Sequence, residues 1–137
     1  MAKSKPIGKL TDDAAILLQK LVRLKAADSD GYANCVTCGA NHHWKELQGG
    51  HFIPRGNSAT KLLEENIHPQ CRGCNGFAMK HGDAAHRYTL YMVDMYGREF
   101  VDDLLGTKGK PYKWFKPDLI DLIADLKSRV KDLEITL

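Results

Sequence analysis

The sequence predicts an α+β fold, in which a small zinc-stapled centre is flanked by an N-terminal helix and a C-terminal helical part. Its length of 137 residues corresponds to one domain. Apolar residues recur at helical spacing near both ends of the chain. All four cysteines lie between these ends as two Cys-x-x-Cys pairs, Cys35 with Cys38 and Cys71 with Cys74.

The composition is that of an ordinary globular protein, with 43% hydrophobic and 27% charged residues. No run approaches the roughly 18 consecutive apolar residues that a membrane span needs. The basic N-terminus is not followed by the apolar core and cleavage site of a secretory signal. We therefore expect a cytoplasmic protein with no membrane partner.

The net charge of +3 is modest, but lysine and arginine gather in the expected loops. Locally basic loops can supply the phosphate contacts that a polyanion requires. The alternative is that these side chains only solvate the surface.

Residues 1–9 are expected to form a mobile basic arm. A first helix follows over residues 10–28, with Thr11 as the N-cap and one apolar face. The centre covers residues 32–82. It holds the first cysteine pair, a strand at residues 44–47, and a second strand at residues 50–53 after a glycine turn.

After the second cysteine pair, we expect a helix that begins at Asn75, lies across the two strands and ends at Gly82. Residues 83–137 are predicted to be helical. One helix ends at Gly97, a short one covers residues 98–105, and the last begins near Pro117 after a lysine-rich loop. The first and last helices should pack together around the centre.

Two Cys-x-x-Cys pairs far apart in the chain are typical of a structural zinc site with four thiolate ligands. Disulfides are disfavoured by the absence of a secretion signal, and a redox dithiol would need only one pair. The site would join two distant turns and fix the residues between them, including His51, Asn66 and Asn75.

These three residues and their spacing resemble a known motif. Gly50-His51, Asn66 and the Cys-x-x-Cys-Asn run that ends at Asn75 are similar to the His-Asn-His (HNH) nuclease motif, with asparagine as its last member. The runs Gly-His-Phe-Ile-Pro-Arg-Gly and Glu-Asn-Ile-His-Pro-Gln-Cys resemble the phage NinG/Rap family of recombination nucleases. The resemblance covers about residues 30–130. It implies a single nuclease domain over residues 1–137 with a ββα-metal (HNH-like) centre.

The resemblance assigns a role to each member of the motif. His51 would be the general base, provided that a carbonyl group pins its other ring nitrogen. Asn66 would hold the loop in place, and Asn75 would offer an oxygen to a catalytic Mg²⁺ or Mn²⁺ ion. Many HNH proteins carry a further metal ligand where this chain has Gly50. The candidates to replace this ligand are His68 and His81. The alternative for His68 is a supporting structural role, and the alternative for His81 is a surface residue that binds no metal.

The resemblance also implies cleavage of branched recombination intermediates, such as Holliday junctions and D-loops, in the cytoplasm of a host bacterium. A homodimer and recombination proteins of phage or host are the further expected partners. Nicking or degradation of foreign DNA is an alternative task, and a non-catalytic zinc-ribbon DNA-binding module is an alternative class. The candidates for DNA contacts are the basic residues around the expected site and in the late loop: Arg55, Lys61, Arg72, Lys80, Arg87, Lys110 and Lys113.

Overall fold

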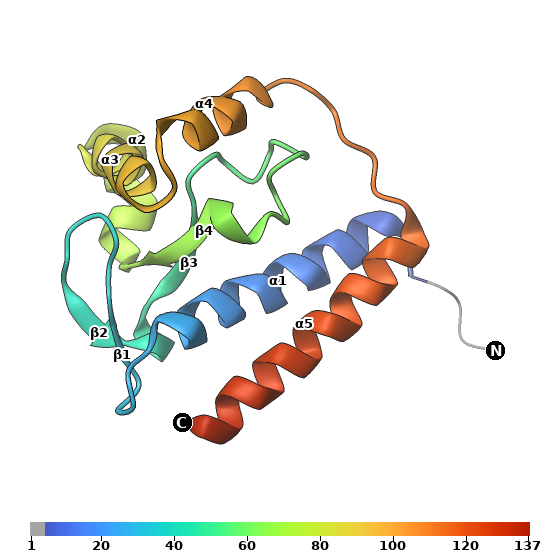
Figure 1. The fold of residues 1–137 in the computed structure, drawn as a ribbon, viewed down its shortest axis with the longest axis horizontal. Coiled ribbons are helices and arrows are strands. Elements are labelled where there is room, and N and C mark those ends of the chain that lie inside the picture. Colours follow the sequence, from blue (N-terminus) through green and yellow to red (C-terminus); the bar gives the residue numbers. More distant parts are fainter. Residues whose placement is uncertain (1–4) are drawn as a thin grey trace.

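Two long helices and two small antiparallel sheets make up the α+β architecture of this protein in a computed structural model that describes residues 5–137 (Figure 1). Helices α1 (Ile7–Ala26) and α5 (Lys116–Thr136) lie side by side. Strands β3 (Gln48–His51) and β4 (Ile67–Gln70) pack on α1. Three shorter helices lie beyond these strands: α2 (Met79–His81), α3 (Ala84–Tyr96) and α4 (Arg98–Gly106). No helix within the described residues is both long and apolar enough to cross a membrane.

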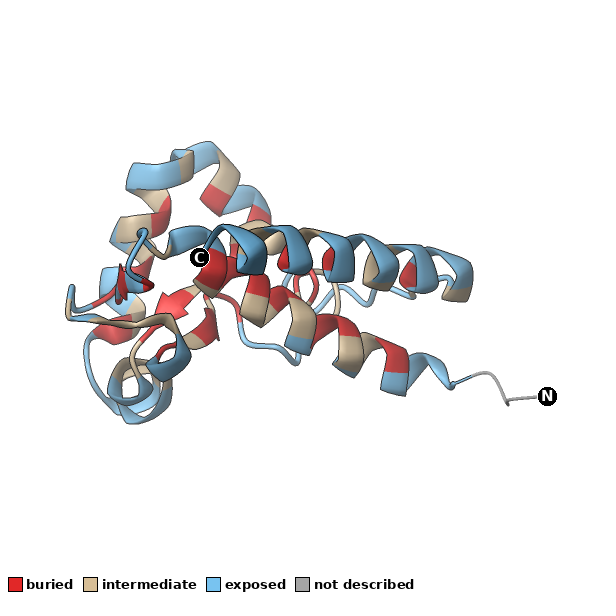
Figure 2. Ribbon diagram, turned by 90° about the horizontal axis from the view of Figure 1, so that it is seen from below, coloured by how far each residue is buried: buried red, intermediate tan, exposed pale blue. Residues whose placement is uncertain are grey.

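The apolar faces of α1 and α5 form the main core. Leu18 and Leu21 of α1 are buried against the same cluster as Leu119 and Leu126 of α5 (Figure 2). This confirms that the first and last helices pack together. It follows the usual rule that an amphipathic helix buries its apolar stripe.

The start of α1 differs from the prediction. The helix begins at Ile7 with Pro6 as its N-cap, so residues 7–9 of the expected arm are helical, and residues 1–4 lie outside the described residues. Thr11 is not the N-cap. Its hydroxyl instead donates to the Gly8 carbonyl at 2.9 Å, because the first turn has already formed before it.

Two strand pairs build the centre. Strand β1 (Tyr32–Asn34) pairs with β2 (Asn41–His43), and β3 (Gln48–His51) pairs with β4 (Ile67–Gln70). The predicted strand at residues 44–47 is wrong, because Trp44–Glu46 is a 3₁₀ helix. The predicted strand at residues 50–53 is correct only in part.

The two central glycines explain this error. They do not form a turn but lie inside β3, where Gly49 faces helix α1. A Cβ atom on Gly49 would lie 2.6 Å from the Cβ of Gln19 and 2.8 Å from its Cα. The missing side chain therefore allows the helix backbone to approach the sheet directly.

The remaining helices agree with the prediction to within a few residues. A π-helical segment (Cys74–Ala78) continues into α2 (Met79–His81), which Gly82 ends. Helices α3 (Ala84–Tyr96) and α4 (Arg98–Gly106) are separated by Gly97, whose φ of 89° suits glycine. These helices cover a second core that contains Phe52, Tyr88 and Met92.

Replacing Gly49 by alanine should lower the free energy of unfolding by about 1–3 kcal/mol, because the new Cβ would push α1 away from β3. Urea denaturation measures this change. Gly56→Ala is the matched control, because nothing lies within 4 Å of a Cβ at that position, and it should change stability by no more than about 0.5 kcal/mol. Equal stability of the two variants would contradict the close packing.

Candidate metal centre and active site

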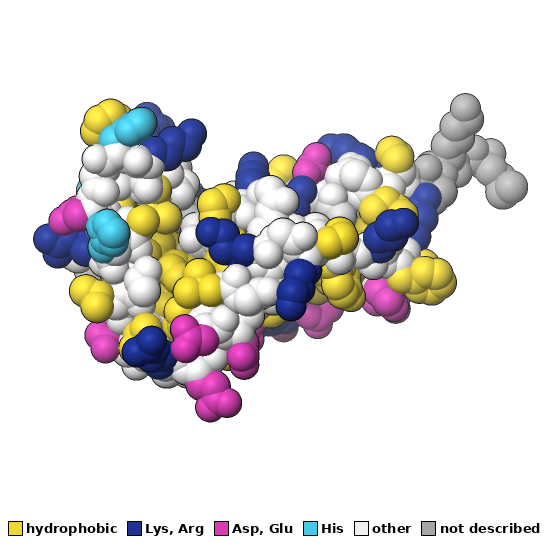
Figure 3. Space-filling view, turned by 90° about the horizontal axis from the view of Figure 1, so that it is seen from above, with side chains coloured by type: hydrophobic (Ala, Val, Ile, Leu, Met, Phe, Trp, Pro, Cys, Tyr) yellow, Lys and Arg dark blue, Asp and Glu magenta, His cyan; other side chains and the backbone are white. Residues whose placement is uncertain are grey.

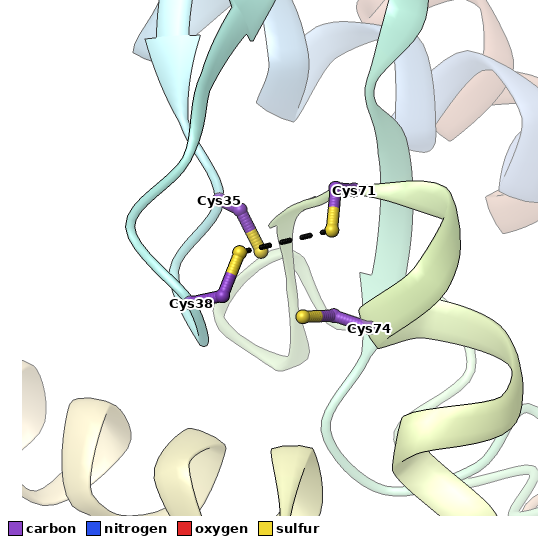
Figure 4. Close-up of side chains that lie close together, drawn as sticks. All are labelled: Cys35, Cys38, Cys71 and Cys74. Atoms are coloured by element: carbon purple, nitrogen blue, oxygen red, sulfur yellow. Dashed lines mark hydrogen bonds between the residues drawn. The ribbon is translucent and has the colours of Figure 1, made fainter.

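The four cysteines converge on one point. Cys35 and Cys38 lie at the turn between β1 and β2, Cys71 follows β4, and Cys74 begins the π-helical segment (Figure 4). Their sulfur atoms all lie within 4.8 Å of one another. The 3.8 Å between Cys38 Sγ and Cys71 Sγ is too long for a disulfide bond. The cluster can therefore bind a metal ion, and a four-thiolate set is one that zinc favours.

The thiols of this cluster differ in acidity. Burial raises the pKa of Cys35, but hydrogen bonds from Thr37 and from backbone groups outweigh it and lower the pKa to about 6. Burial raises the pKa of Cys74 to about 12, with the neighbouring cysteines adding to the effect. One thiol therefore ionises readily, whereas the full set of thiolates needs a cation to balance its charge.

His51 ends strand β3 and is partly buried. Its Nε2 atom lies 2.9 Å from the carbonyl oxygen of Lys61. Because a carbonyl only accepts, Nε2 must carry the proton, which leaves Nδ1 with a free lone pair. Burial has the largest effect on the pKa of His51 and lowers it. The hydrogen bond to the Lys61 carbonyl opposes this shift, whereas the charges of Arg55 and Lys61 add to it. The ring is therefore neutral at pH 7, and the carbonyl contact expected from the sequence is present.

Asn66 is fully buried and closes the loop between β3 and β4. Its Oδ1 accepts from the backbone amide of Ile53 at 2.9 Å. Its Nδ2 donates to the carbonyls of Ile53 at 3.0 Å and Thr60 at 3.2 Å. Asn66 thus holds the loop by backbone contacts, as expected, and this loop carries the Lys61 carbonyl that orients His51.

Asn75 connects the helical segment to strand β3. Its Nδ2 donates to Gln48 Oε1 at 2.8 Å, and its Oδ1 faces Gly50. A Cβ on Gly50 would lie 2.9 Å from Asn75 Oδ1 and only 1.8 Å from Gln70 Oε1. Position 50 therefore has no room for a side chain. Sequence reasoning missed Gln70, since a single glutamine in a polar run carries no pattern.

His68 lies in a hydrogen-bonded chain with two tyrosines. Its Nε2 is 2.8 Å from the hydroxyl of Tyr96, and its Nδ1 is 3.2 Å from that of Tyr88, which donates to the Gly50 carbonyl at 2.7 Å. Burial lowers the pKa of His68 to about 4, so the ring is neutral at pH 7. With both ring nitrogens engaged, His68 supports strand β3 and offers no atom to an ion in this arrangement.

His81 lies on the surface, and its ring packs against Phe77 with 4.9 Å between the ring centroids. Within the described part of the chain, the one group of three or more histidine, cysteine or acidic side chains close enough to share a metal ion is the cysteine cluster. Neither His68 nor His81 is therefore brought into a ligand group with other such residues.

The candidate DNA-contacting residues divide into two groups. Arg55, Lys61 and Lys113 line a cavity of about 470 Å³ together with Tyr112 and Trp114. Lysine and arginine side chains are spread along the face shown in Figure 3, and acidic groups lie mainly near its lower edge. The remaining candidates lie outside the cavity and are exposed: Arg72, Lys80, Arg87 and Lys110.

Two of these basic groups already have acidic partners. Lys61 Nζ lies 2.9 Å from Asp12, and Arg87 Nε lies 2.8 Å from Asp83. A DNA phosphate would have to compete with these carboxylates. Arg55 and Lys113 form no such ion pair with the described residues.

Comparison with known families gives a match over nearly the whole chain. The family described as Bacteriophage Lambda NinG protein matches residues 1–135. The chain belongs to the NinG family. The match extends over both flanking helices as well as the cysteine cluster. No curated protein and no solved structure matches the chain significantly.

Replacing Cys71 by serine in this NinG protein should abolish metal binding and lower the melting temperature by several degrees, because metal binding at such a site contributes directly to folding. Metal analysis and thermal melting measure both effects. Chelator treatment of the wild type should cause the same shift, and the exposed Ser128→Ala variant should cause none. Full metal content with unchanged melting in Cys71→Ser would refute the four-thiolate site.

Proposed function

We propose that this NinG-family protein is a metal-dependent DNA endonuclease that hydrolyses phosphodiester bonds at a ββα-metal (HNH-like) site. The observation that carries the proposal is the protonation state and the orientation of the His51 ring. Its ring is neutral and is oriented by the Lys61 carbonyl, and it follows Gly50, the residue that Asn75 Oδ1 faces. Strands β3 and β4, followed by the helical segment that carries Asn75, provide the ββα order. The preference for branched recombination intermediates rests on the family resemblance.

In this mechanism His51 Nδ1 accepts a proton from the attacking water, while Nε2 stays bonded to the Lys61 carbonyl. Asn66 keeps that carbonyl in place through the loop at residues 52–66. Asn75 Oδ1 accepts no hydrogen bond from the described residues, so it fits a hard cation. A Mg²⁺ or Mn²⁺ ion bound there would stabilise charge on the phosphate and on the leaving oxygen.

The cavity lined by Arg55, Lys61 and Lys113 provides a path for the DNA strand next to this site. Lys61 belongs to both, because its side chain lines the cavity and its carbonyl holds His51. The exposed ring of Tyr112, 5.3 Å from the ring of Trp114, which itself packs against the main core, offers a surface on which an unpaired base can stack. Such bases occur at branch points, which agrees with the proposed substrate.

The same cavity supports a second candidate function, a DNA-binding module that does not cut. A basic and aromatic surface on a metal-stabilised frame needs no catalytic residue to bind DNA. The neutral, carbonyl-oriented ring of His51 favours the nuclease, because simple binding does not require this arrangement.

Replacing His51 by alanine should reduce cleavage about 10²–10⁴-fold and leave DNA binding unchanged, because the variant lacks the general base. Cleavage with Mg²⁺ or Mn²⁺ is measured on linear, flapped, looped and four-way DNA. His86→Ala, at an exposed histidine of α3, is the matched control and should cleave like the wild type. The nuclease proposal fails if the wild type cuts none of these substrates with either ion.

The pH dependence of cleavage should show the lowered pKa of His51. The base works only when it is neutral, so the rate should rise with pH, and the inflection of the profile should lie below the ordinary histidine pKa of about 6.5. Single-turnover rates at saturating metal ion measure the profile, and His86→Ala should leave it unchanged. An inflection above pH 7 would exclude His51, in this environment, as the base.

A further inference from the structure

Gln70, the last residue of β4, has a buried oxygen atom without a partner. The side chain is fully buried, and Oε1 accepts no hydrogen bond from the described residues. Leaving such a buried acceptor without a partner destabilises the folded state. The structure therefore requires a hydrogen-bond donor or a cation at this atom.

The orientation of the Gln70 amide is fixed by the cysteine cluster. Its Nε2 donates to Thr37 Oγ1 at 3.2 Å, and Thr37 Oγ1 lies 3.3 Å from Cys35 Sγ. A metal-bound thiolate only accepts hydrogen bonds, so the Thr37 hydroxyl donates to the sulfur and keeps a lone pair for Gln70. Turning the amide would break this chain, and Oε1 therefore faces Gly50.

A second amide oxygen faces the same place. Asn75 Oδ1 and Gln70 Oε1 both lie within 2.9 Å of the point that a Cβ on Gly50 would occupy. Asn75 cannot turn without loss, because its Nδ2 is bonded to Gln48. Two acceptors that face each other, with no donor from residues 5–137 between them, suit a cation, and neutral oxygens of this kind are ligands of hard divalent ions.

We propose that Gln70 Oε1 is a ligand of the divalent cation, supplied from β4 in place of a side chain at position 50. The inference rests on the proposed function, in which Asn75 binds this ion. It explains why position 50 is glycine, since a ligand-bearing side chain there would collide with the Gln70 amide. The cation would keep its other positions for water and a substrate phosphate.

The test is the affinity of the full chain for Mn²⁺ without DNA, measured from the electron paramagnetic resonance signal of free Mn²⁺, with the cysteine site loaded with zinc. Gln70→Met removes the oxygen at similar volume and should weaken binding on the order of tenfold. Gln70→Glu keeps an oxygen and adds charge, so it should bind at least as tightly as the wild type. Gln19→Met, on the α1 side of β3, is the matched control and should not change the affinity.

Unchanged affinity in Gln70→Met would overturn the proposal, and so would a wild type that binds no Mn²⁺, in which case water fills the space. Retained or tighter binding in Gln70→Glu, together with a loss in Gln70→Met, supports it, because misfolding does not strengthen binding. If Mn²⁺ binds through Gln70 but the wild type cuts no DNA, the nuclease proposal alone fails. If the wild type cuts but both Gln70 variants bind Mn²⁺ as it does, the ligand assignment alone fails.

Discussion

The convergence of four thiols is the constraint on which the centre of this protein depends. It joins the turn between β1 and β2 to the start of the helical segment after β4. The consequences extend beyond the cluster, because Thr37 touches Cys35 on one side and Gln70 on the other. A metal ion bound by the cysteines would therefore fix the direction of an amide group in the proposed active site.

Strand β3 lies between two close contacts that only glycine permits. The backbone of α1 packs closely against Gly49 on one face of the strand. The side-chain amide groups of Gln70 and Asn75 pack closely against Gly50 on the other face. The Gly50 carbonyl is held in addition by the Tyr88 hydroxyl. A strand that is fixed on both faces provides a rigid base for His51, and rigid support of this kind is what precise placement of a catalytic side chain requires.

The sequence was sufficient for the features that depend on local pattern. Apolar spacing located α3, α4 and α5, and the cysteine spacing located the cysteine cluster. The pairing of β3 with β4 could not be found in this way, because the glycines of β3 have the appearance of a turn and β4 contains Pro69. The strand depends instead on contacts with α1, which are remote in sequence.

The proposed site was predictable to a similar degree. The motif located His51, Asn66 and Asn75, and the expected carbonyl contact of His51 is present. The role of Gln70 depends on a fold contact with Gly50, and the hydrogen bonds of His68 depend on tyrosines from α3. Neither leaves a signal in the local sequence.

Anomalous diffraction from crystals that contain both Zn²⁺ and Mn²⁺ tests the central claim most directly. The claim is that one metal ion holds the frame and that the frame places a second ion at Gly50, the residue before His51 in β3. It predicts a zinc peak among the four cysteines and a manganese peak between Asn75 Oδ1 and Gln70 Oε1 at Gly50. A zinc peak at the cysteines without manganese at Gly50 would contradict it.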